Sequence, residues 1–241
     1  MWLLENLSEK MRKKRIAILQ SNYIPWKGYF DLIRNVDEFI ILDEVQYTKN
    51  DWRNRNKIKT RTGVEWITIP VRQERLDQSI SSIQTLDGRW AHKHWTSLVH
   101  NYSRSPYFSS YANSIEAAYV AGSQLRSLSA INLLFIRLIC HFLEIKTVIS
   151  SSTDYMLQGG RIDRLISLCK QASGDDYLTG PSARNYIDER LFEDANILLG
   201  WADYTQYAEY QQLFQPFQHE VTVLDLLFNT GPNAQSHLKN F

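Results

Sequence analysis

The sequence predicts an α/β protein with a Rossmann-like, mostly parallel sheet and an inserted helical block. A buried strand over residues 15–20, a helix over 29–36 and a second apolar strand over 39–43 follow one another closely. Strands joined through a helix in this way are parallel, with a right-handed crossover. The same rhythm resumes after residue 146, beyond three helical patterns within 89–145. We therefore expect the helical block to be an insertion.

The remaining elements follow from apolar periodicity and from turn residues. Residues 63–71 alternate between two faces, which is typical of a strand. We expect, in order, a third strand over 63–71, helices over 89–101, 107–120 and 125–143, a strand over 146–152, a helix over 161–172, a short strand ending at Gly180, a last strand over 196–203, and a helix stopped at Gly231. Residues 15–241 then form a single α/β domain, and residues 1–14 are predicted to be a poorly ordered leader.

The amino-acid composition indicates which classes of protein fit this chain. The 241 residues are 44% hydrophobic and 22% charged, which suits a globular domain with a sizeable core. The 27 basic and 26 acidic side chains leave a formal net charge of +1. No overall field attracts the chain to nucleic acid or to an anionic membrane.

The cysteines and the apolar runs indicate the compartment. Cys140 and Cys169 are far apart and lie in helical patterns, which predicts free thiols in a reducing environment such as the cytoplasm. The first fifteen residues contain acids that interrupt any secretory signal. The most apolar run, residues 131–143, contains Arg137 and is shorter than the ~20 residues that cross a bilayer. We expect no transmembrane segment.

Three polar, aromatic loops leave predicted strands after Gln20, Asp43 and Gly180. The carboxyl ends of parallel strands share one edge of a sheet, where ligands of such folds bind. We therefore expect the three loops to surround one cavity. The alternative is that polar loops follow strands everywhere, which explains any one of these loops better than all three together.

The candidate binding residues belong to these loops and carry hydrogen-bonding or aromatic side chains. The substrate-binding candidates are Gln20, Asn22, Tyr23, Trp26, Gly28, Tyr29, Gln46, Tyr47, Trp52, Arg53, Asn54, Arg55, Gly180, Ser182, Arg184 and Tyr186. On an extended segment Arg53 and Arg55 would point the same way, which suits a diphosphate. The alternative is a solvated charged face paired with Asp51.

Asp43 and His94 are the catalytic candidates. Asp43 ends an apolar strand, where a carboxylate can act as a base, orient an amine or simply cap a loop. His94 could be a general base, although a surface or core histidine is the more frequent case. His92 and His94 do not share a helical face, so we expect no metal site. Cys169 could accept an acyl group, but its apolar helical face favours a packed thiol.

Several segments carry a family resemblance. "QSNYIPWKGYFDLI", "LDEVQYTKNDWRNRNKIKT", "WITIPV", "YLTGPSARNYID" and "LDLLFNTG" together resemble the WbqC-like family over about residues 16–231. This resemblance implies a role in O-antigen or related surface-polysaccharide biosynthesis. The implied reaction transfers an amino acid, with glycine suggested, or another acyl group to an amino sugar. His94 matches a family position. Two departures are Ser21, where the family usually has proline, and Thr222, where it usually has serine.

A more remote resemblance concerns nucleotidyltransferases and adenylate-forming ligases. "WKGY" stands where these enzymes have H-x-G-H, with Gly28 retained and both histidines missing, so nucleotidyl transfer by the usual means is doubtful. "GPSARNY" looks like their phosphate-holding loop, with Ser182 and Arg184 suited to an anion. A helix N-cap at Ser182 beside a surface arginine is the alternative.

These observations leave three functions. The first is an N-acyltransferase or aminoacyl (glycine) transferase that forms an amide on a nucleotide-linked amino sugar. Its cofactor is unknown, and the acyl source could involve ATP, an acyl carrier protein thioester or a coenzyme A thioester. The second is a non-catalytic protein that binds a nucleotide sugar or a pathway partner. The third is nucleic-acid binding through the basic, aromatic residues 48–61, which the net charge disfavours. The oligomeric state and a lid role for residues 89–145 stay open.

Overall fold

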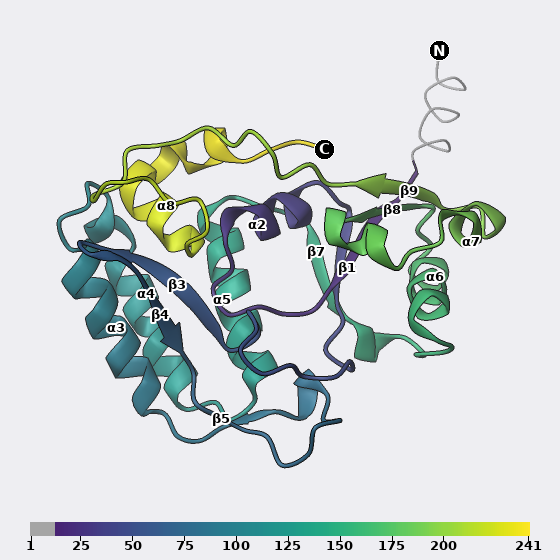
Figure 1. Ribbon diagram of the computed structural model, residues 1–241, viewed down its shortest axis with the longest axis horizontal. Helices are drawn as coiled ribbons and strands as arrows, with labels where there is room; N and C mark the ends of the chain where they lie inside the picture. Colours follow the sequence, from purple (N-terminus) through teal and green to yellow (C-terminus); the bar gives the residue numbers. More distant parts are fainter. Residues whose placement is uncertain (1–12) are drawn as a thin grey trace, which may run out of the picture.

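A five-stranded, entirely parallel sheet organises the protein (Figure 1). The computed structural model describes residues 13–241. The predicted leader therefore lies almost wholly outside the described residues. The strands, in the spatial order β7-β2-β1-β8-β9, are β7 (Val148–Ser151), β2 (Glu38–Ile41), β1 (Arg15–Leu19), β8 (Asp176–Thr179) and β9 (Leu198–Trp201). This confirms the predicted Rossmann-like α/β fold.

The strand order creates a switch point at β1. From β1 the chain moves outward through β2 to β7, and then returns to the other side of β1 to form β8 and β9. Connections on the two sides therefore leave the sheet in opposite directions. In folds of this class ligands bind outside the carboxyl ends of the strands at such a switch point.

Helices cover both faces of the sheet. Phe39 and Ile41 of β2 belong to a core cluster that includes residues of α2 (Lys27–Arg34) and α5 (Leu128–Phe142). The intervening Ile40 faces the opposite side, where α6 (Arg161–Gln171) and α7 (Glu189–Asp194) contribute to a second cluster. This alternation is what a strand buried on both faces requires, and each fully buried large apolar side chain contributes roughly 1.5–3 kcal/mol.

The predicted helical block is present between β2 and β7 in chain order. It consists of α3 (Arg89–Tyr102), α4 (Phe108–Ser123) and α5. The apolar stripe of α5, which includes Ile131 and Phe135, is buried in the main core. The Ser127 side chain caps α5 by accepting a 3.2 Å bond from the N–H of Ala130.

The strand expected over residues 63–71 is present over most of that range as β4 (Gly63–Thr68). It pairs antiparallel with β3 (Arg55–Thr60), which was not predicted, outside the parallel sheet. Figure 1 shows this hairpin beside α3, on the side of the molecule away from α6 and α7. The sequence did not reveal β3, because Ile58 is the only apolar side chain in its "RNKIKT" segment. A second small pair, β5 (Val71–Arg72) with β6 (Gln84–Thr85), follows.

The last helix, α8 (Val223–Thr230), ends where predicted. Gly231 adopts φ +55°, a conformation that favours glycine, and a Cβ there would overlap the ring of Tyr107. At its start the Thr222 hydroxyl accepts a 3.3 Å bond from the N–H of Leu224. Short 3₁₀ helices are η1 (Ile80–Ser82), η2 (Ser152–Asp154), η3 (Pro181–Asn185) and η4 (Gly231–His237). Within residues 13–241, no helix is long and apolar enough to span a membrane.

Candidate functional site

The three predicted loops leave neighbouring strands at one edge of the sheet. β1 pairs in parallel with β2 on one side and with β8 on the other. Gln20, Asp43 and Gly180, which follow these strands, are therefore brought to the same edge. The first two loops are further joined by hydrogen bonds between their side chains.

Asp43 anchors the first loop from beneath. Its carboxylate accepts a 2.8 Å bond from the N–H of Ser21 and a 2.7 Å bond from the Ser21 hydroxyl. Asn132 of α5 donates to the Ser21 hydroxyl at 3.0 Å and to the carbonyl oxygen of Arg53 at 2.9 Å. Asp43 is only 4% exposed. These contacts match the loop-capping interpretation of Asp43.

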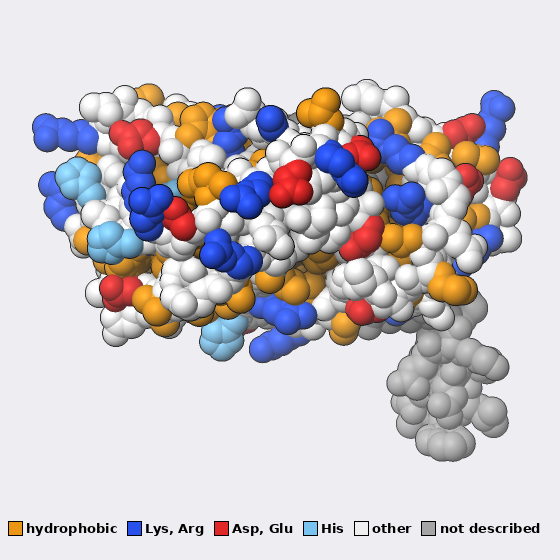
Figure 2. All heavy atoms as spheres, turned by 90° about the horizontal axis from the view of Figure 1, so that it is seen from below, with side chains coloured by type: hydrophobic (Ala, Val, Ile, Leu, Met, Phe, Trp, Pro, Cys, Tyr) orange, Lys and Arg blue, Asp and Glu red, His pale blue; other side chains and the backbone are white. Residues whose placement is uncertain are grey.

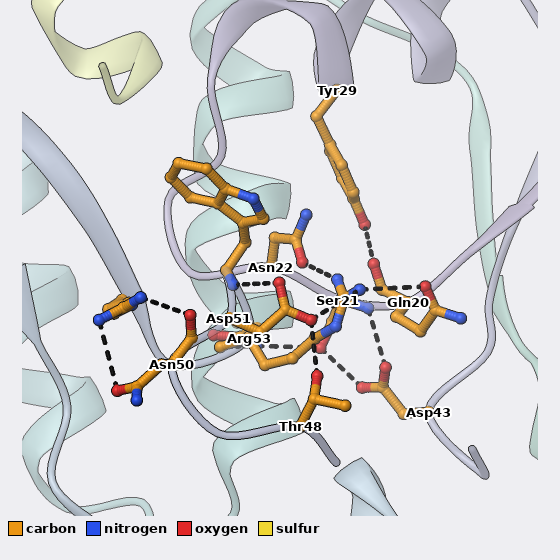
Figure 3. A network of polar contacts seen from close by, with 12 residues as sticks. Gln20, Ser21, Asn22, Tyr29, Asp43, Thr48, Asn50, Asp51 and Arg53 are labelled. Atoms are coloured by element: carbon orange, nitrogen blue, oxygen red, sulfur yellow. Dashed lines mark hydrogen bonds and ion pairs between the residues drawn. The ribbon is translucent and has the colours of Figure 1, made fainter. Parts of the chain in front are cut away.

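Arg53 ties the second loop to the first (Figure 3). Its guanidinium donates to the side-chain oxygen of Asn22 and, at 3.3 Å, to that of Gln20. Asp51 lies 3.7 Å away and also accepts a 2.6 Å bond from the Thr48 hydroxyl. Burial alone would raise the pKa of Asp51, but the Thr48 bond and the Arg53 charge together hold it below its usual value.

Arg53 and Arg55 do not lie on the same extended segment. Arg53 lies in the turn that precedes β3, whereas Arg55 is the first residue of that strand, so the alternation of an extended segment does not include both. The Arg55 guanidinium lies 4.1 Å from the ring centre of Trp66 and donates to Asn50. The expected joint diphosphate clamp is therefore replaced by two separate arginines.

His94 is a core histidine. It is 3% exposed, and its Nδ1 lies 2.9 Å from the hydroxyl of Tyr23, which is itself 3.1 Å from that of Tyr119. The rings of Trp90 and Phe135 pack against Tyr23. Desolvation lowers the pKa of His94 to about 4, so the imidazole is neutral at pH 7.

A cavity of about 460 Å³ opens between the first loop, the second loop and the segment that follows β9. Trp26, Trp52, Tyr204 and Tyr207 give it a partly aromatic wall. The lining residues are Asn22, Pro25, Trp26, Trp52, Asn56, Tyr204, Gln206, Tyr207, His219 and Glu220. Of the predicted site residues, Asn22, Trp26 and Trp52 meet here. Asp43 and His94 do not line the cavity.

Trp26 forms the central wall. Its ring packs edge-on against Tyr204, with ring centres 5.3 Å apart, and against Tyr207 at 5.7 Å. The ring lies over Gly28, where a Cβ would overlap it. The close approach that requires glycine at this position is thus made by the neighbouring tryptophan.

Another part of the wall comes from residues 204–220, none of which was a predicted site residue. The His219 ring lies 4.6 Å from that of Phe217, and its Nδ1 is buried without a hydrogen-bond partner in the described structure. Glu220 accepts a 3.2 Å bond from Lys57 of β3. The sign of this wall in the sequence is the high aromatic content of "YTQYAEYQQLFQPFQHE". That segment has neither helical nor strand periodicity.

A buried polar cluster lies behind this wall. Lys27 is 3% exposed, and its ammonium lies 4.4 Å from the ring centre of Tyr207. Burial lowers its pKa to about 8, against the opposing influence of Asp31 and Asp225. Burial also raises the pKa of Asp31 to about 6, although the Tyr207 hydroxyl and the N–H of Lys239 donate to its carboxylate.

The third loop does not line the cavity, so the expectation that all three loops surround it is wrong for this loop. Gly180 packs near the ring of Tyr204, while the Arg184 guanidinium lies 4.3 Å from the ring centre of Trp201. Tyr186 is covered by Arg161 at 3.3 Å, and Ser182 is exposed. None of these four predicted residues lines the cavity.

The other predicted residues support the loops. Gln46 donates to the carbonyl oxygen of Leu76 at 2.7 Å, and Asn54 to that of Ile69 at 2.8 Å. The Tyr29 hydroxyl donates to the carbonyl oxygen of Gln20 at 2.9 Å. Tyr47 is buried in the main core.

Charge and metal-ligating groups are dispersed. On the face seen in Figure 2, basic side chains are interspersed with acidic ones. Residues 13–241 contain no group of three or more His, Cys, Asp and Glu side chains that could hold a metal ion. Cys140 and Cys169 are free and buried, and burial raises the pKa of each thiol to about 12, so neither is a thiolate at pH 7.

Comparison with known proteins agrees with the resemblance seen in the sequence. A model of the WbqC-like protein family matches residues 20–237. A Mycobacterium tuberculosis (strain ATCC 25618 / H37Rv) relative, described as "Uncharacterized protein Rv1507c", is 47% identical over 228 residues, which cover 94% of this chain and 98% of the relative. No solved structure matches the chain. The match over residues 20–237 and the nearly full-length relative show that this chain belongs to the WbqC-like protein family.

Proposed function

We propose that this protein transfers an acyl or aminoacyl group, such as glycine, to the amine of a nucleotide-linked amino sugar. The observation that carries the proposal is the cavity between the loop that follows β1 and the segment that follows β9, with Trp26, Trp52, Tyr204 and Tyr207 in its lining. Its volume of about 460 Å³ suits a small ligand. Aromatic faces stack on nucleobases and pack against the apolar faces of sugar rings.

Cations border the cavity where a diphosphate would lie. Arg53 bonds to Asn22, a cavity residue, and keeps 15% of its side chain exposed. Lys57 pairs with Glu220, whose side chain is 75% exposed. Exposed ion pairs of this kind contribute at most about 1 kcal/mol, so a phosphate can compete for the lysine.

The reaction needs an activated acyl donor. Its carboxyl carbon would be attached to AMP, as an adenylate made from ATP, or to the sulfur of coenzyme A or a carrier protein. The sugar amine attacks this carbon, and a base removes the amine proton. Amide N–H donors such as that of Asn22 would stabilise the oxyanion that develops. We infer a cytoplasmic site for this chemistry, since both cysteines are free and buried.

The direct test incubates the protein with nucleotide-linked amino sugars and each donor class, and searches for the amide by mass spectrometry. A product whose mass equals that of the sugar nucleotide plus the acyl group, minus one hydrogen, supports the proposal. No product with any donor, together with no binding of any sugar nucleotide, contradicts it.

The contacts of Asp43 and His94 favour a second candidate function. Both predicted bases are buried outside the cavity. Asp43 is hydrogen-bonded to Ser21, and His94 to Tyr23. A non-catalytic protein that holds a sugar nucleotide or a pathway partner would need only the cavity. Saturable binding of the sugar nucleotide without turnover in the presence of any donor identifies this alternative.

A further inference from the structure

We propose that His219 is the general base of this site and takes the proton from the attacking sugar amine. This inference rests on the proposed acyl transfer and deepens it. It replaces Asp43 and His94, which both lie outside the cavity.

The position of His219 suits this role. It is the histidine that lines the aromatic cavity, and it is partly buried there. Phe217 packs edge-on against its ring at 4.6 Å, and Tyr207 lies 6.3 Å away. Its Nδ1 has no hydrogen-bond partner in the described structure. Because Nδ1 is buried, Nε2, the other ring nitrogen of this cavity residue, is the atom that would take a proton from a ligand.

Burial, helped by one nearby cation, favours the neutral form of His219. Burial and the ammonium of Lys27, on α2, lower the pKa of His219, while Glu209 acts in the opposite direction. Glu220 is next in sequence and pairs with Lys57. The net direction is downward, so the imidazole is neutral at pH 7 and offers a lone pair.

The step balances in atoms and electrons. The sugar nitrogen forms a bond to the acyl carbon of the adenylate or thioester, and the carbon–oxygen or carbon–sulfur bond to the leaving group breaks. The electron pair of that bond leaves with AMP or with the thiolate. The amine proton moves to His219, and the resulting imidazolium returns it to the leaving group or to water.

Lys27 acts in this proposal as a positioning residue. Its ammonium lies against the ring of Tyr207, a neighbour of His219, and is almost fully buried. Lys27→Met retains the side-chain length and removes the charge. We expect the acid limb of the kcat–pH profile to move to higher pH, because His219 loses the cation that lowers its pKa. A purely structural role would lower kcat without moving this limb.

The decisive experiment compares His219→Gln with His92→Gln, which alters an exposed histidine on α3. Amide formation and sugar-nucleotide affinity are measured for the parent and both variants. We expect His219→Gln to lower kcat by about 10²- to 10⁴-fold, with Kd within threefold of the parent, and His92→Gln to match the parent.

Failure of the inference about His219 and failure of the proposed function give different experimental results. If the parent forms the amide and His219→Gln retains kcat within threefold, the inference about His219 is overturned while the proposed function survives. If the parent binds sugar nucleotides but forms no amide with any donor, the acyl transfer and the base are both overturned. Equal loss of kcat in His92→Gln would also contradict a specific role for His219.

Discussion

Asp43 and Ser21 are joined by two hydrogen bonds, from the Ser21 N–H at 2.8 Å and from its hydroxyl at 2.7 Å, at the point where β1 and β2 end. The pair fixes the start of the loop that carries Asn22 and Trp26 into the cavity. The carboxylate thus accepts from both the backbone and the side chain of Ser21, and its substitution should lower the stability of the protein.

The first prediction separates a supporting role for Asp43 from a catalytic one. Asp43→Asn places an amide NH₂ against a donor, and hydrogen bonds to a charged acceptor contribute ~1.5–3 kcal/mol each. We expect the free energy of unfolding, measured by urea titration, to fall by about 2 kcal/mol, and by about 1 kcal/mol for Ser21→Ala. Unchanged stability combined with abolished amide formation would instead make Asp43 the base.

The second prediction concerns the packing of Trp26 over Gly28. Gly28→Ala places a methyl group inside the ring of Trp26 and should displace the central wall of the cavity. We expect at least a tenfold loss of sugar-nucleotide affinity, measured calorimetrically. Gly122→Ala in α4 is the matched control, because its Cβ would lie 3.5 Å from the nearest atom, at ordinary contact distance. Equal affinity in the two variants would show that Trp26 does not shape the binding site.

The third prediction separates Arg53 from Arg55. Arg53→Ala removes the bonds to Gln20 and Asn22 and should weaken binding at least tenfold. Arg55→Ala removes a stacking contact with Trp66 outside the cavity and should leave Kd within threefold. Similar losses in both variants would restore the joint diphosphate clamp that the sequence suggested.

The fourth prediction is a pH dependence of stability that comes from His94. Its pKa is lowered to about 4 in the folded protein, against about 6.5 when unfolded. The unfolded chain therefore binds more protons between these values, so this contribution is complete above pH 6.5 and is lost as the pH falls through 4. Its full size is about 3 kcal/mol.

Asp31 has the opposite effect over part of the same range, because its raised pKa of about 6 favours the folded state at low pH. The measurement is therefore the difference in unfolding free energy between the parent and His94→Gln. We expect the unfolding free energy of the parent to fall relative to that of His94→Gln when the pH is lowered from 7 to 4. A flat difference would mean that His94 titrates normally.

The fold was largely predictable because its signals are local. The βαβ unit and the helices showed clear periodicity in runs such as 15–43 and 125–143. The first strand of the hairpin, β3, was missed because it is mostly polar and is stabilised by partners distant in sequence: Tyr102 bonds to the N–H of Lys59, whose Nζ bonds to the carbonyl oxygen of Pro216.

The site was only partly predictable. Asn22, Trp26 and Trp52 were found because they follow strands that end at a common edge. The wall over residues 204–220 was not, since it has no regular periodicity and reaches the cavity only through tertiary packing. The burial of Lys27 was equally hidden, because a lysine at the start of a helix is ordinarily exposed.

The most direct test of the central claim is a calorimetric titration of a nucleotide-linked amino sugar into the parent, Trp52→Ala and Trp66→Ala. The two tryptophans are matched, since they are similarly exposed, at 38% and 44%, and their ring centres lie 5.2 Å apart, but only Trp52 lines the aromatic cavity. We predict saturable binding to the parent, at least a tenfold loss in Trp52→Ala, and a Kd within threefold of the parent in Trp66→Ala. No binding to the parent, or equal binding by all three proteins, would contradict the assignment of the cavity as the substrate site.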